Sequence, residues 1–123
     1  MSPSLSLLYD RIRTEEKELI NAAEKRGIGL KAVDAKELHL TLTEPSKERE
    51  LFGNVVIERC VSYFRGLHIT ATLEGKGIRV INPHSVASVC GNKLLSSILL
   101  AKEGIPTPKT VVAFTREEAM RAL

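Results

Sequence analysis

Two polar residues that suit carboxylate binding follow an apolar stretch in the middle of the chain. The stretch Val55–Arg59 is predicted to be a central strand that finishes in Arg59, and Ser62 follows three residues later. A guanidinium paired with a hydroxyl group is a good receptor for a carboxylate. The same residues also fit an ordinary loop in which Ser62 caps a helix, and the sequence leaves both interpretations open.

A second polar group follows the first predicted strand, Ser4–Tyr9. Asp10 comes directly after this strand, at the carboxyl edge where open α/β sheets bind ligands, and Arg11 and Arg13 could meet an anion there. We therefore treat Asp10 as a candidate substrate-binding residue. The alternative is a solvated loop.

Lys93 is the remaining candidate, this time for a phosphate. It begins an amphipathic stretch in which Leu94, Leu95, Ile98 and Leu99 recur at helical spacing. The first amide groups of a helix together with a lysine ammonium favour a phosphate, although an exposed helix lysine is commonly just solvated.

The histidines and cysteines indicate no catalytic or metal site. His39, His68 and His84 are scattered without a partner at a fixed spacing. Cys60 and Cys90 lack the spacing of a zinc site or of a disulfide framework, so we expect two free, buried thiols. No Walker-type phosphate loop is present, and we interpret the two Gly-x-Gly triplets, at 27–29 and 75–77, as helix ends.

The composition is that of a folded soluble protein. Among 123 residues, 43% are apolar and 27% are charged, with a formal net charge of +3. The apolar runs are far shorter than the roughly 20 residues of a membrane span. Acids and bases are interspersed, so we expect no nucleic-acid partner and no membrane partner. The N-terminus does not resemble a secretory signal, so we expect a cytoplasmic protein.

The elements that would position these residues alternate between strands and helices. Strands are predicted at 4–9, 29–34, 55–59 and 78–81, and helices at 14–26, 84–88 and from 93 to Gly104. Thr14 is the predicted cap of the first helix. Weaker patterns predict an edge strand at 38–43, a surface loop at 44–50, a strand at 109–114 and a capped helix from Thr115. The order predicts an α/β fold with a mostly parallel sheet flanked by helices.

Local signals conflict at residues 62–73. The stretch Leu67–Leu73 alternates apolar and polar residues and is rich in β-branched residues, which favours a strand. A parallel partner for the strand at Val55 needs a crossover, however, and this requirement favours a helix. We predict the helix.

Three segments give the chain a resemblance to a known family: Ser6–Asp10, Glu58–Ser62, and Cys90–Leu94 with Gly104–Thr110 after it. In this order and spacing they resemble the LysX family of ATP-grasp ligases and, more widely, RimK-type ligases. The resemblance implies a pre-ATP-grasp α/β domain at residues 1–82, followed at 83–123 by a linker helix and the truncated start of the ATP-grasp fold. A receiver-like fold remains only as an analogy, because Arg59 stands where that family needs an aspartate.

The resemblance also implies a reaction and a set of ligands. Lys93 matches an early family lysine that approaches ATP phosphates, although Asn92 precedes it where aspartate is common. Family members use ATP and Mg²⁺ to activate a carboxylate that an amine then attacks. The implied partners are the acidic carrier protein LysW and an acidic amino acid, 2-aminoadipate or glutamate, with Arg59, Ser62 and Asp10 on the substrate side.

A chain of this length lacks the family's remaining ATP-binding and metal-binding residues. We therefore expect it to be inactive alone and to bind neither ATP nor Mg²⁺ stably. The competing hypothesis is a stand-alone, non-catalytic module that acts by binding or dimerisation, and a homo-oligomer is possible under either hypothesis.

Overall fold

The computed structural model describes residues 4–44 and 47–123 and divides the chain into two compact units. The first unit extends to Ala87, and the second begins at Ser88. Within the described residues, no helix is long and apolar enough to cross a membrane.

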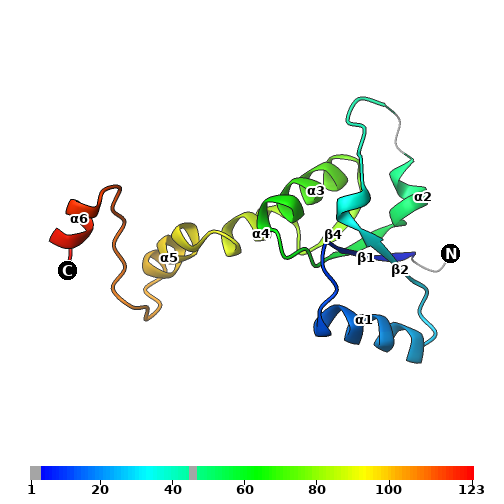
Figure 1. The fold of residues 1–123 in the computed structure, drawn as a ribbon, viewed down its shortest axis with the longest axis horizontal. Coiled ribbons are helices and arrows are strands. Elements are labelled where there is room, and N and C mark those ends of the chain that lie inside the picture. The colour runs from blue at the N-terminus through cyan, green and yellow to red at the C-terminus, as the bar shows by residue number, and fades with distance from the viewer. Residues whose placement is uncertain (1–3, 45–46) are drawn as a thin grey trace. The chain divides into compact units, whose positions relative to one another are not determined.

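A parallel sheet of four strands forms the centre of the first unit (Figure 1). The strands are β1 (Leu5–Tyr9), β2 (Leu30–Asp34), β3 (Val55–Glu58) and β4 (Arg79–Ile81), in the order β2-β1-β3-β4. All three neighbouring pairs are parallel, so the predicted α/β fold class is confirmed. The chain moves outward from β1 to β2 on one side and to β3 on the other, which places a topological switch point between β1 and β3.

Helices cover both faces of this sheet (Figure 1). Helix α1 (Thr14–Lys25) lies on one face, and α2 (Glu48–Phe52) and α3 (Tyr63–Gly75) lie on the other. A short 3₁₀ helix, η1 (Ala35–Glu37), follows β2. The main core lies on the α2 and α3 face and consists of Leu8, Val33, Ala35, Phe52, Val56, Leu73, Ile78 and Val80.

The ambiguous segment at 62–73 is part of α3, so the helix prediction is confirmed. Ser62 caps the helix by accepting a hydrogen bond from the amide of Arg65, and Thr70 and Leu73 are buried. The segment forms a helix in spite of its β-branched residues, because the parallel connection from β3 to β4 requires a crossover. Topology has therefore outweighed the local strand propensity.

Two predictions between β2 and β3 were wrong. Residues 38–43 form no strand; Leu38 and Leu40 pack against the core from an irregular segment, so their alternation reflects burial rather than strand pairing. The predicted loop at 44–50 contains the start of α2, while residues 45 and 46 lie outside the described residues. Helix α2 is stabilised there because Phe52 is buried and Glu48 forms an ion pair with Lys76 at 3.2 Å.

The second unit contains helices but no strand among its residues. Helix α4 (His84–Cys90) spans the division between the units, and α5 (Lys93–Lys102) and α6 (Arg116–Arg121) follow. Thr115 caps α6 by accepting a hydrogen bond from the amide of Glu118, as predicted. The strand predicted at 109–114 was wrong, because a strand needs a partner and no pairing forms there among the described residues.

Candidate functional site

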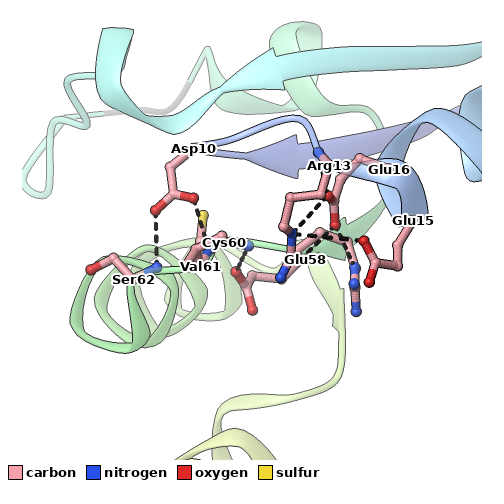
Figure 2. Close-up of polar contacts among 9 residues, drawn as sticks. Asp10, Arg13, Glu15, Glu16, Glu58, Cys60, Val61 and Ser62 are labelled. Carbon is pink, nitrogen blue, oxygen red and sulfur yellow. Dashed lines mark hydrogen bonds and ion pairs between the residues drawn. The ribbon is translucent and has the colours of Figure 1, made fainter.

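The loops that follow β1 and β3 meet at the switch point of the sheet. They carry Asp10 and Arg13 on one side and Arg59 and Ser62 on the other. Figure 2 shows the polar contacts that join the two loops. The structure therefore brings together three of the four predicted site residues, Asp10, Arg59 and Ser62.

Asp10 is buried and connects the first loop to the start of α3. Its Oδ1 accepts a hydrogen bond from the amide of Val61 at 2.8 Å, and its Oδ2 accepts one from the amide of Ser62 at 3.1 Å (Figure 2). The same Oδ2 accepts a bond of 2.7 Å from the guanidinium of Arg65. Burial works against ionisation, but these bonds outweigh it and lower the pKa of Asp10. Both of its carboxylate oxygens are thus engaged within the protein.

A second acid, Glu16, lies completely buried at the start of α1 and binds two arginines. Arg13 donates to it from its backbone amide, from Nε and from a terminal nitrogen, at 2.8–3.0 Å. Arg59 donates to it from Nε at 3.0 Å, across 43 positions of sequence. The bonds from Arg13 come first among the causes that lower the pKa of Glu16 to about 2. Thr14, the predicted cap, is instead the first helical residue, after the cap residue Arg13.

The two terminal nitrogens of the Arg59 guanidinium are available to bind a ligand. Among the residues that the structure describes, its side chain bonds only through Nε, and the side chain is 36% exposed. It lines an open hollow of about 670 Å³ together with α1 residues that include Thr14 and Leu19. An arginine held at Nε can still donate from both terminal nitrogens to a carboxylate.

Ser62 lies two residues from a half-buried thiol on the same loop. The hydroxyl oxygen of Ser62 accepts the capping bond from α3, which leaves the hydroxyl proton free to donate.

Cys60 is half-buried, and burial followed by the nearby charge of Glu58 raises the pKa of its thiol. A thiol in this environment is a poor nucleophile. Cys90, predicted to be buried, is exposed at the last position of α4.

Lys93 belongs to the second unit and is exposed as the first residue of α5. The side-chain oxygen of Asn92 accepts the amides of Leu94 and Leu95 at 3.1 and 3.2 Å. These amides would otherwise be among the free donors at the start of the helix. Lys93 therefore offers a charge, but the helix does not present a prepared cradle of amides for phosphate.

No magnesium site fits the side chains that the structure describes. The described residues contain no group of three or more His, Cys, Asp or Glu side chains that could hold a metal ion. The buried acids Asp10 and Glu16 are both neutralised by arginines. We assign no step of chemistry to a metal bound by this chain.

Sequence reasoning missed the two residues that organise the site, Glu16 and Arg65. Glu16 was not among the predicted site residues, and its spacing of three from Arg13 was the one available signal. The pairs Glu16–Arg59 and Asp10–Arg65 link positions 43 and 55 residues apart. Such contacts follow from the sheet order, which places the two loops side by side.

Comparison with protein families decides the classification of this chain. The family model for the LysX pre-ATP-grasp domain matches residues 5–89, which include the whole sheet and the loops of the candidate site. The chain belongs to the LysX pre-ATP-grasp domain family. The predicted family resemblance is confirmed.

Relatives of this LysX-type chain include two ligases from Sulfurisphaera tokodaii. The α-aminoadipate–LysW ligase LysX is 36% identical over 116 residues, and the glutamate–LysW ligase ArgX is 34% identical over 118 residues. Each alignment covers 94% of this chain but only 41% and 40% of the relative. The chain thus spans about two fifths of the length of the curated relatives it matches.

A solved structure supports the same classification for the LysX-type fold. The crystal structure of a RimK domain ATP-grasp protein from Sphaerobacter thermophilus matches with a TM-score of 0.77 and 27% identity. The match covers 97% of this chain and 44% of that protein.

Proposed function

We propose that this chain is the N-terminal part of an ATP-dependent ligase that joins a carboxylate to an amine. The observation that carries the proposal is the guanidinium of Arg59, which is fixed at the switch point of a LysX-type sheet with its outer edge open. Ligands of open α/β sheets bind at this position, at the carboxyl ends of the strands.

In this proposal the first unit binds the carboxylate-bearing substrate. Arg59 donates to the carboxylate and Ser62 adds a hydroxyl donor, while Asp10 acts indirectly by fixing the loop that carries them. The activities for which the two relatives are named favour an acidic amino acid, 2-aminoadipate or glutamate, and the carrier protein LysW as the substrates.

Lys93 would contribute one positive charge to the ATP phosphates, at the start of the ATP-grasp fold that we place at residues 83–123. ATP supplies the free energy of amide formation, and Mg²⁺ would offset the phosphate charge. The chain spans about two fifths of the length of its relatives, and in this proposal the remaining ATP and metal ligands belong to the rest of the ligase, so we expect the chain to be inactive alone. As a biosynthetic ligase, the protein would work in the cytoplasm.

The test is to replace Arg59 with alanine in the full-length gene product and to measure ligation kinetics. Loss of a charge-assisted pair of hydrogen bonds, worth about 1.5–3 kcal/mol, should raise KM for the carboxylate substrate roughly 10- to 100-fold. The matched control is Arg26→Ala, because Arg26 is exposed at the far end of α1. Equal KM values for the wild type and Arg59→Ala would refute the substrate role of Arg59.

A second candidate function is a stand-alone module that acts by association. The exposed apolar side chains of α5, which are Leu94, Leu95, Ile98, Leu99 and Leu100, favour it. A ligation assay on the natural gene product distinguishes the two, because the module should show no ligase activity at any concentration, and analytical ultracentrifugation should show it forming homo-oligomers as its concentration rises.

A further inference from the structure

Glu16 is the most deeply buried charged side chain near the candidate site, and the proposed function leaves it without a role. Its side chain is 0% exposed, yet it lies beside two arginine side chains that are 38% and 36% exposed. Arg13 alone already supplies three hydrogen bonds to this carboxylate. The additional bond from Arg59 therefore does more than satisfy a buried charge.

The bond between Glu16 and Arg59 fixes the direction of the guanidinium. An arginine side chain has many rotamers, and a bond at Nε from a carboxylate that cannot itself move restricts most of them. Glu16 cannot move because Arg13 clamps it on the rigid first turn of α1. The bond to Glu16 uses only Nε, so the terminal nitrogens of Arg59 stay available to a substrate carboxylate while Nε is held in place.

We infer that Glu16 is a positioning residue that orients Arg59 for bidentate binding of the substrate carboxylate. The inference rests on the proposed function, because it concerns the same substrate-binding site. Glu16 does not contact the substrate. It holds the guanidinium of Arg59 in one orientation before the substrate binds, which lowers the free-energy cost of ordering Arg59 on binding.

This role predicts a specific pattern of kinetic changes in the full-length gene product. Glu16→Gln keeps the shape of the side chain but removes its charge, so Arg59 is held weakly, and KM for the carboxylate substrate should rise roughly tenfold. The kcat value at saturating substrate should change less than twofold. In an Arg59→Ala background, Glu16→Gln should leave KM unchanged, because the residue that it positions is gone.

The controls separate positioning from a structural role. Glu24→Gln, an exposed change near the end of the same helix, should leave both kinetic constants at wild-type values. Circular dichroism checks that each variant is folded at the assay pH. A purely structural role for Glu16 would lower kcat through loss of folded enzyme, or would raise KM further in the Arg59→Ala background, and either result would overturn the inference.

Two other outcomes are equally decisive. If Arg59→Ala raises KM but Glu16→Gln lowers it, Glu16 only offsets the charge of Arg59, and the positioning role is wrong while the proposed function stands. If neither variant changes KM, the proposed substrate role of Arg59 fails first, and the inference fails with it.

Discussion

Replacing Glu16 with glutamine should make the stability of the protein much less sensitive to acid. The bonds from Arg13, helped by Arg59, lower the pKa of Glu16 from 4.5 to about 2. At about 1.4 kcal/mol for each pH unit, this shift corresponds to ~3 kcal/mol of folding free energy. Because both arginines are more than one-third exposed, solvent screening reduces the expected value to about 2 kcal/mol.

The direction of the effect follows from proton binding. The pKa of Glu16 is lower in the folded protein, so the unfolded chain binds more protons between pH 5 and pH 2. The stabilisation from Glu16 is therefore complete above about pH 5 and is lost as the pH falls through about 2. Glutamine imitates the protonated acid, so the wild type and Glu16→Gln should differ by about 2 kcal/mol at pH 7 and converge near pH 2.

The assay is urea unfolding followed by circular dichroism at a series of pH values between 7 and 2. A domain of this size has a total stability of about 5–15 kcal/mol, so the difference is measurable without unfolding the variant at neutral pH. Glu15→Gln is the control; its ion pair with Arg13 is exposed and 4.0 Å long, and it should cost less than about 0.5 kcal/mol. A gap between wild type and Glu16→Gln that stays constant with pH, or no gap at all, would refute the reasoning.

Three further predictions concern the core, a turn and the thiols. Leu73→Ala should destabilise the protein by about 2–5 kcal/mol in urea unfolding, because Leu73 is fully buried in the main core. Gly53→Ala should lower the free energy of unfolding by about 1–3 kcal/mol, since Gly53 has a φ of +75° and an added Cβ would lie 2.7 Å from a backbone oxygen. The control Gly75→Ala should lower it little, because no atom lies within 4 Å of a Cβ added there. With a disulfide reagent at pH 8, exposed Cys90 should react at least tenfold faster than half-buried Cys60, because burial raises the pKa of the Cys60 thiol. Equal reaction rates would contradict the burial of Cys60.

The sheet could be predicted from the sequence because its strands are short apolar runs separated by segments long enough for crossovers. The helix at Ser62 required topology as well as pattern, since its β-branched residues favour a strand. The segment at Leu38 shows the limit of periodicity: its alternating leucines pack on the core without pairing to a strand. Burial on one side produces the same alternation whether or not hydrogen bonds to a neighbouring strand exist.

The proximity of the two loops after β1 and β3 could be predicted from the sequence, but the pairing of their side chains could not. Residues that follow strands in a parallel α/β fold must meet at one edge, which is why Asp10 and Arg59 could be placed together. The pairing of Asp10 with Arg65 and of Glu16 with Arg59 depends on side-chain geometry across the loops. Sequence spacing carries no information about such pairs, so Glu16 remained unnoticed as an organising residue.

The most direct test of the proposed ligase function is the intact mass of the carrier protein after incubation with the full-length gene product, ATP, Mg²⁺ and an acidic amino acid. A LysW-type carrier should gain the mass of one amino-acid residue, with 2-aminoadipate or with glutamate, as ATP is converted to ADP and phosphate. A carrier whose mass is unchanged with both amino acids, in the presence of folded protein, would contradict the ligase function.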